Sequence, residues 1–542
     1  MVLSHVPPTL PKEPRLSFWW GVAVLLACAA LVRMVRWRFF SGALEIEGSE
    51  YARIAENLLA GKGYVGLLDG KELMLPPLMS MATALVSFLS GLEPAFSCRF
   101  VSLASSLVAI VVAADLGKRI WNERVGLIAA FLFGFAPLLV LSGTAAFSEM
   151  LQVCLLLLAM RAAIDALNGN IIATFACGIT LGFAYLARIE SLPAAALTIL
   201  VISVARLRQS GKAAGLTCLC LLTLSFLLGA LPYALYVHEQ TGSVSVAGKA
   251  ARVFLTIERF AAGQELGEAN YAIAADGTPE GPWLSPNAPY DGPDALTILR
   301  RSTGSVLGHM ARNAAEVSFQ LLSGKGLSSV FLLMFAGFAL RDHIKRREIW
   351  IPLLLLGVAA GSFAMAILYK VLLRYSLTLS IPIFLLAARG CDLWLLKHRG
   401  TTRPKIAALP ALAYFSLFGI VFLGPGEFRE GFESNRGMLQ ATQVLRDHAK
   451  GVPSLRLMAS DSRLPHLCGP DWTWIPLPHA RSPEAFFQFA RSTQASFVVL
   501  STSDERTRIA AWANQMGEQT HWDLVGRVES HGLSVYRLRP LR

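Results

Sequence analysis

The sequence predicts a polytopic α-helical membrane protein that ends in a small α/β domain. Of its 542 residues, 54% are hydrophobic and 16% are charged, and the mean hydropathy is +0.50. Such a chain cannot cover itself with the polar surface of a soluble globule. Apolar runs long enough to cross a bilayer recur up to about residue 425, and strand-like runs with more charges follow them.

The formal net charge of +12 does not indicate binding to nucleic acid. The basic residues gather in short loops between apolar runs, where positive-inside sorting places them in the cytoplasm. Of the eight cysteines, most fall in apolar runs and none forms a CxxC pair. We therefore predict no disulfide framework, no metal requirement and no cofactor other than the substrates.

The first apolar run, 16–35, has the length of one span. No small-residue cleavage site precedes the arginines that follow it, so we predict a retained anchor with a cytoplasmic N-terminus. An outside N-terminus is the alternative, because Arg33, Arg36 and Arg38 outnumber the two basic residues ahead of the run. We rank it lower because it separates the acidic loop that follows from the other charges at span ends.

The segment 47–64, EGSEYARIAENLLAGKGY, predicts an amphipathic helix. From Tyr51, apolar residues recur at i, i+3, i+4, i+7 and i+8, and polar residues occupy the other face. Such a helix is expected to lie flat on the bilayer. Glu47 is expected just ahead of the helix, where the helix dipole favours a carboxylate, and Gly61 and Gly63 end it.

The stretch 76–117 contains two apolar runs but must cross the membrane once if the loop 39–75 is exoplasmic. The run 76–90 is shorter than the roughly seventeen residues that a span needs. We therefore predict a partly inserted or tilted helix there, with the true span near 100–117.

Three basic loops fix the remaining topology, which totals about eleven to thirteen spans. Spans are predicted near 125–143, 150–166, 171–187, 191–206, 214–236, 326–340, 349–369, 375–394 and 406–424. The large loop 237–325 is then exoplasmic. Within it, 263–294 is expected to be irregular and 295–322 to be an amphipathic helix.

The chain divides into a transmembrane domain, 1–425, and an exoplasmic α/β domain, 426–542. In the second domain, strand-like runs at 454–459, 496–500 and 533–537 alternate with helical stretches. The absence of eukaryotic sorting signals favours the inner membrane of a bacterium, with the C-terminus in the periplasm.

Charged residues at the predicted exoplasmic span ends are the candidate functional residues, because ionisable groups at membrane depth are costly. They are Glu47, Glu149, Arg188, Glu190, Lys370 and Arg374. A carboxylate beside several cations suits a reaction in which a hydroxyl loses its proton while a phosphate leaves. The carboxylate would act as general base, and the cations would neutralise the leaving group.

Each of these residues also has a simpler explanation. They could be carboxylates at helix termini, side chains that reach toward water, or anchors for lipid headgroups. Only their coincidence on one predicted face indicates a site. Glu258, His238 and His309 lie in the large loop with no partner visible in the sequence, and we expect them to be structural or surface residues.

The ordered set of these motifs resembles the polyprenyl-phosphate-dependent glycosyltransferases of the C superfamily. The resemblance is to family 39 in particular, which includes protein O-mannosyltransferases and lipid A aminoarabinose transferases. That family has the exoplasmic motif D-E-x-x-Y-A-x-I-A-x-N-L-L-x-G-x-G-Y, followed by a P-P-L helix. The matching segments here are 47–64, Pro76-Pro77-Leu78, 99–103 (RFVSL), Ser148-Glu149, 187–190 (ARIE), and Arg374-Tyr375 followed by Pro382.

The resemblance implies the transfer of a sugar from a polyprenyl-phosphate carrier to an exoplasmic acceptor hydroxyl, with inversion at C1. Glu47 stands where the family has its catalytic Asp, and Gly48 replaces the Glu that follows, so the base lies one methylene further from the backbone. The implied donor-phosphate ligands are Arg188, Lys370, Arg374 and Tyr375. The implied residues that orient the acceptor or the cations are Glu50, Tyr51, Glu149 and Glu190.

Two other classes of protein stay open. A flippase or transporter of lipid-linked sugars would also need charges in the membrane and a site for lipid phosphate. Transporters usually show paired repeats with broken spans, and we find none here. A catalytically inactive scaffold is the third possibility, because Glu47 replaces an Asp. The motifs do not specify the sugar or the class of acceptor.

Overall fold

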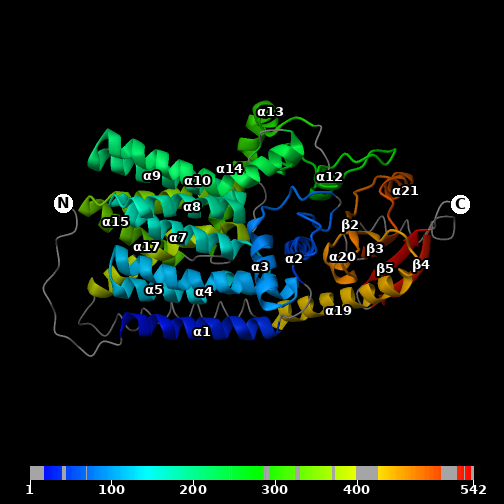
Figure 1. Cartoon of the computed structure of the whole chain (residues 1–542), viewed down its shortest axis with the longest axis horizontal. Coiled ribbons are helices and arrows are strands. Elements are labelled where there is room, and N and C mark those ends of the chain that lie inside the picture. The colour runs from blue at the N-terminus through cyan, green and yellow to red at the C-terminus, as the bar shows by residue number, and fades with distance from the viewer. Residues whose placement is uncertain are drawn as a thin grey trace.

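The computed structural model describes residues 17–39, 44–68, 70–242, 245, 247–285, 287, 292–323, 330–368, 373–397, 425–501, 522–529 and 532–538. Lys370 and the span predicted near 406–424 lie outside these residues. Figure 1 shows a bundle of long helices with an α/β region beyond one of its ends. The predicted fold class is confirmed.

Long apolar helices form the bundle, and the protein is integral to a membrane. In the described part of the chain, seven helices are long and apolar enough to cross a bilayer, or eight if one bent pair counts as a span. The seven are α1 (Phe18–Phe39), α4 (Pro94–Ile120), α7 (Glu149–Leu167), α9 (Leu192–Ser210) with the turn η1 (Ile189–Ser191), α10 (Lys212–Thr241), α16 (Trp350–Leu368) and α17 (Ser380–Lys397) with the turn η2 (Leu373–Leu379). The 17-residue helices α8 (Ile171–Ala187) and α15 (Val330–Arg346) are at the lower limit of length for a span.

The structure agrees with a single crossing between residues 76 and 117. The helix α3 (Leu78–Ser90) has 13 residues, which is too few to span, and it ends at Gly91 in the left-handed conformation with φ +69°. The 27-residue helix α4 follows and is long enough to cross.

The span predicted as one helix over 125–143 is broken, which corrects that prediction. It consists of α5 (Glu123–Phe135) and α6 (Pro137–Thr144), which meet at 58°. Pro137 has no N–H, so the carbonyl of Phe133 loses its helical donor at this point. In lipid such a break persists only where another group satisfies the freed backbone.

Arg33 of α1 supplies that group. Its guanidinium donates to the carbonyl oxygens of Gly134 at 2.7 Å and Phe133 at 3.4 Å, and to Ser106 Oγ at 3.0 Å. The side chain is 0% exposed. Arg33 is therefore a structural residue inside the bundle. Its charge is not a loop charge and does not favour an outside N-terminus.

The helix α2 (Ile46–Leu59) is covered by protein on both faces, which corrects the expectation that it lies on the bilayer. Its apolar face, with Tyr51 and Ala52, packs against α3 and α4. On its polar face, Arg53 is only 2% exposed because the α/β region covers it. Glu47 belongs to the first turn of the helix and does not precede it.

The large loop is more helical than the sequence predicted. It contains α11 (Ala250–Ala261) and, inside the segment expected to be irregular, α12 (Leu266–Tyr271). The expected helix over 295–322 is two helices, α13 (Ala295–Arg301) and α14 (Thr303–Ser323), which are separated at Ser302.

The C-terminal region contains a five-stranded sheet in the order β2-β1-β3-β5-β4. Its strands are β1 (Arg456–Ala459), β2 (Thr473–Pro476), β3 (Phe497–Ser501), β4 (Trp522–Val528) and β5 (Leu533–Leu538). β1 is parallel to β2 and β3, whereas β5 is antiparallel to β3 and β4. The strands predicted from the sequence are β1, β3 and β5, while β2 and β4 were missed.

Helices cover both faces of this sheet. On one face, α19 (Pro425–His448) and α20 (Arg463–Cys468) build an apolar core with the strands. On the other face, α21 (Pro483–Ser492) packs together with Ile273 and Leu284, which come from the large loop between α10 and α13. The α/β region is therefore joined to the large loop between α10 and α13 by a shared core.

Candidate active site

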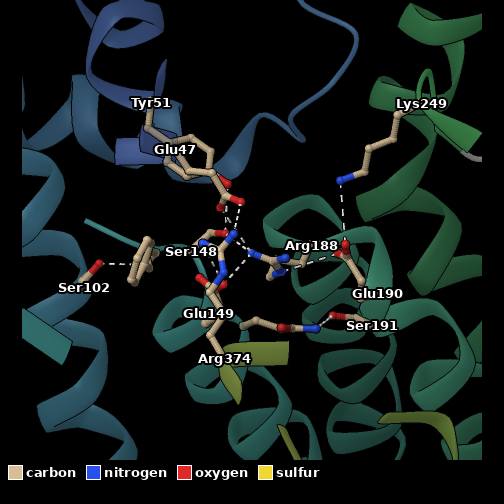
Figure 2. A network of polar contacts seen from close by, with 12 residues as sticks. Glu47, Tyr51, Ser102, Ser148, Glu149, Arg188, Glu190, Ser191, Lys249 and Arg374 are labelled. Carbon is tan, nitrogen blue, oxygen red and sulfur yellow. Dashed lines mark hydrogen bonds and ion pairs between the residues drawn. The ribbon is translucent and has the colours of Figure 1, made fainter. Parts of the chain in front are cut away.

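The candidate active site is a cluster of carboxylates and guanidinium groups at the end of the bundle that faces the α/β region (Figure 2). Glu47 Oε1 lies 2.5 Å from Arg374 Nη2, and Glu47 Oε2 lies 3.7 Å from Arg188 Nη1. Glu149 Oε1 lies 3.0 Å from Arg188 Nη1 and 3.6 Å from Arg374 Nη1. Two carboxylates and two guanidinium groups thus form one network, built from α2, α7, the end of α8 and η2.

A second pair extends this network toward the large loop. Arg188 caps the C-terminus of α8 in an extended conformation, and the turn η1 that follows places Glu190 Oε2 3.4 Å from Arg188 Nε. Lys249 Nζ, at the start of α11, lies 3.7 Å from Glu190 Oε1. The sequence reasoning missed Lys249, because a lone basic residue in a loop carries no signal until the fold brings it to a carboxylate.

Hydroxyl and aromatic groups hold the guanidinium groups in place. Ser148 Oγ lies 2.9 Å from Tyr51 Oη and accepts a hydrogen bond from Arg188 Nη1 at 3.1 Å. The ring of Tyr375 lies 5.3 Å from the guanidinium carbon of Arg188 and 5.2 Å from that of Arg374, within the range of a cation–π contact. Tyr51 and Tyr375 therefore join the site, as does Ser148, which was noted in the sequence only as the neighbour of Glu149.

Burial shows that this cluster is not an assembly of solvated surface charges. The side chains of Glu149 and Arg188 are 2% and 7% exposed. Arg188 is thus not a side chain that reaches out of the membrane into water, and Glu149 is not a simple helix cap. Three carboxylates (Glu47, Glu149 and Glu190) face three cations (Arg188, Arg374 and Lys249), so the formal charges of the cluster balance.

The cations keep Glu47 ionised. Burial by itself would raise the pKa of this carboxyl, but the positive charges of Arg374, Arg188 and Lys249 outweigh that effect and hold the pKa below its usual value. Glu47 is therefore a carboxylate at neutral pH and able to accept a proton.

Glu50 is not part of the cluster, although the family motif grouped it with the site. Its Oε2 accepts a hydrogen bond from the amide of Leu67 at 2.9 Å, and Glu72 is the charge that most affects it. Burial and the neighbouring Glu72 together raise the pKa of Glu50 to about 8. Glu50 thus supports the loop after α2.

A cavity of about 500 Å³ opens beside the cluster. Glu47, Glu190, Lys249 and Tyr375 line its polar side. The remaining wall is mostly apolar and aromatic: Ile46, Met74, Leu75, Ile189, Leu192, Pro193, Ala247, Ala250, Val253, Phe254, Asn270, Tyr271, Trp283, Met365 and Leu368. A cavity with this division can hold a molecule that carries a charged group beside an apolar one.

Comparisons with known proteins agree with this arrangement. The family model described as dolichyl-phosphate-mannose-protein mannosyltransferase matches residues 75–228, which include Glu149, Arg188 and Glu190. No curated protein sequence matches the chain.

Solved structures match over nearly the whole chain. ArnT from Cupriavidus metallidurans bound to undecaprenyl phosphate is 14% identical with a TM-score of 0.55, over 96% of this chain and 98% of that one. The oligosaccharyltransferase of Archaeoglobus fulgidus in its apo form is 14% identical with a TM-score of 0.61, over 94% of this chain and 73% of that one. The archaeal oligosaccharyltransferase AglB from the same organism, in complex with an inhibitory peptide and a dolichol-phosphate, is 12% identical with a TM-score of 0.60, over 92% and 72%.

The fold of the protein follows from these matches. The chain folds like the membrane glycosyltransferases of the C superfamily, and at the level of the fold the resemblance noted in the sequence is confirmed.

Proposed function

We propose that this protein is a glycosyltransferase that moves a sugar from a polyprenyl-phosphate carrier to a hydroxyl group of an exoplasmic acceptor. The observation that carries the proposal is the contact of Glu47 with both Arg188 and Arg374 at the edge of a largely apolar cavity. The fold likeness to ArnT bound to undecaprenyl phosphate and to AglB with a dolichol-phosphate supports a lipid-linked donor.

In the proposed step, the acceptor oxygen attacks C1 of the donor sugar. Glu47 takes the hydroxyl proton as the new C–O bond forms. The bond between C1 and the phosphate oxygen breaks, and its electron pair leaves with the phosphate. Attack opposite to the leaving group inverts the configuration at C1.

The same cations have two tasks in this proposal. In the structure, Arg188 and Arg374 are each paired with Glu47 and Glu149. A donor phosphate competes for both guanidinium groups, and bidentate binding of a phosphate suits arginine. When they turn toward the phosphate, Glu47 loses its counterions and becomes a stronger base, while the leaving group gains charge stabilisation.

The other residues take supporting roles. Tyr375 and Lys249 would add contacts to the phosphate, as would Lys370, for which only the sequence argues. Glu149, Glu190 and Tyr51 would orient the guanidinium groups or the acceptor. The catalytic side would be exoplasmic, in a bacterial inner membrane, and no metal would be required.

Glu47→Gln tests the proposed base. The amide keeps the shape of the side chain but cannot take the proton, so we expect transfer to fall by about 10²–10⁴-fold. The purified protein, reconstituted into liposomes with lipid-linked sugars extracted from the cells that express it, is assayed by mass spectrometry for released polyprenyl phosphate.

The matched control is Glu93→Gln, an exposed carboxylate at the start of α4, which should keep wild-type activity. Full activity of Glu47→Gln would show that Glu47 is not the general base. The wild-type protein releasing no polyprenyl phosphate would favour a flippase or an inactive scaffold.

A further inference from the structure

The helix that carries Glu47, α2, is bound to the α/β region through the side chain of Arg53. Arg53 donates to four backbone carbonyl oxygens at the end of α20 and just beyond it: Gly469 at 2.7 Å, Pro470 at 3.0 Å, Trp472 at 3.2 Å and Pro465 at 3.5 Å. Its Nε lies 2.9 Å from a carboxylate oxygen of Glu56. A guanidinium group with five N–H donors in a fixed fork suits this set of acceptors, and an ammonium group does not.

A second contact, with the residue that precedes α20, lies nearer to Glu47. Ser462 Oγ is 3.1 Å from Ser49 Oγ and donates to the carbonyl of Ile46 at 3.2 Å. Ser462, Ser49 and Arg53 are all buried. The α/β region therefore contacts the first two turns of α2 from Ile46 to Arg53, over about 10 Å at a rise of about 1.5 Å per residue.

The opposite side of α2 rests on the turn that leads into α7. A Cβ atom on Gly48 would lie 2.6 Å from Ala146 Cβ, so the two segments touch without free space. The amide of Ala146 donates to Glu45 Oε2 at 2.8 Å. Ser148 and Glu149 of the site follow within three residues of this contact. A shift of α2 would therefore move Glu47 relative to the network that it completes.

We propose that Arg53 is a positioning residue, through which the C-terminal α/β region holds α2 and sets the place of Glu47 opposite Arg188 and Arg374. This inference rests on the proposed role of Glu47. It makes the α/β region a working part of the active site, although none of its side chains reaches the cluster in the described structure.

The chain offers a matched control for the test. Arg446 of α19 caps the same turn of α20, donating to the carbonyls of Leu467 at 2.6 Å and Cys468 at 3.2 Å. Arg446→Met and Arg53→Met each remove a guanidinium group from carbonyls at this end of α20, but only Arg53→Met removes the link to α2.

The first readout does not depend on activity. Hydrogen–deuterium exchange of the full-length protein is followed in the peptide containing Ala146, whose amide reports the position of α2 from the side away from Arg53. We expect faster exchange there in Arg53→Met, and wild-type exchange in Arg446→Met. Equal exchange in the two variants would overturn the proposal, whether or not the wild-type protein releases polyprenyl phosphate.

The second readout is the pH profile of polyprenyl phosphate release, with the extracted lipid-linked sugars as donor. Misplacement of a catalytic group by about 1 Å can cost about 10²-fold in rate, so turnover of Arg53→Met should fall by about that factor with little change in the KM for the donor. Its acidic limb should move to higher pH, because Glu47 loses part of its contact with Arg374 and Arg188, while Lys249, Glu149, Tyr51 and Tyr375 still face it.

Arg53→Lys should recover only part of the rate, and Arg446→Met should keep the wild-type acidic limb. If both Met variants lose activity equally and neither moves that limb, Arg53 only stabilises the fold. If exchange responds as expected but the wild-type protein releases no polyprenyl phosphate, the positioning link stands and the proposed function fails.

Discussion

Two carboxylates on one helix have opposite properties because their surroundings differ. Glu47 and Glu50 are three residues apart on α2, and both are partly or fully buried. Two arginines and a lysine hold the pKa of Glu47 low. At Glu50, burial and the neighbouring Glu72 outweigh the amide of Leu67 and the charge of Arg53, and they raise the pKa to about 8. The charge of each neighbour decides which carboxylate is ionised at neutral pH.

Glu50→Gln should make the protein more stable at alkaline pH. The pKa of Glu50 is raised from 4.5 to about 8 by folding, so its contribution to stability is full below pH 4.5 and is lost as the pH rises through 8. A neutral amide removes this dependence. We expect a smaller fall in melting temperature between pH 5.5 and 8.5 in detergent than for the wild-type protein.

Glu93→Gln serves again as the control, since its exposed carboxylate should leave the pH dependence of the melting temperature unchanged. An unaltered slope in Glu50→Gln would mean that Glu50 is already ionised in the folded protein.

At the scale of elements, the broken span determines where the site lies. The break at Pro137 bends α6 away from α5, and the chain then turns through 145–149 to deliver Ser148 and Glu149 to the cluster. Arg36 of α1 donates to Thr144 Oγ1 at 2.7 Å, so α1 contacts both the break and the far end of α6. The first span therefore stabilises the broken helix that leads into the turn 145–149, in addition to crossing the membrane.

Arg33→Met should destabilise the protein, because it removes the hydrogen bonds between α1 and the break between α5 and α6. It leaves the carbonyls of Phe133 and Gly134 without their donor, at about 1–3 kcal/mol for each unsatisfied group. The melting temperature in detergent should fall by several degrees. Arg38→Met, at an exposed position of the same helix, should change it little.

Pro137→Ala refines this test, because it returns a backbone N–H that can bond the carbonyl of Phe133. In that background Arg33→Met should cost less than in the wild-type protein. An equal cost in both backgrounds would show that Arg33 does not act through the proline break.

In the whole molecule, charged residues lie at both ends of the apolar bundle, and they differ in their roles. The site lies at one end, next to the α/β region (Figure 1). At the other end, ion pairs such as Arg161 with Asp115 at 2.7 Å and Arg389 with Asp342 at 3.1 Å tie helix ends together. Long apolar helices between them keep the two ends apart.

Placing the site end outside the cytoplasm is testable with single cysteines. Lys450→Cys in the α/β region should react with a membrane-impermeant maleimide on intact cells, whereas Arg208→Cys at the end of α9 should react only after the membrane is opened. The wild-type protein gives the background of its own eight cysteines. The reverse pattern would place the site in the cytoplasm.

Length and composition were enough to predict the long helices and the charges at their ends. Crossing a bilayer is a requirement that each apolar segment meets alone, so length and composition suffice to find it. The break at Pro137 and the missed short strands mark the limit of this reasoning, because they depend on a donor or a neighbouring strand from elsewhere in the chain.

Which charges lie together depends on the packing of segments that are far apart in the chain. Glu47 and Arg374 are 327 residues apart, and Arg53 is 417 residues from Pro470. Local periodicity contains no information about such pairs. Packing brought Lys249 and Ser148 into the network, turned Glu50 away from it, and covered the polar face of α2 with the α/β region. The physical reason is that a buried charge is stable only beside its partner, and the fold of the whole chain supplies that partner.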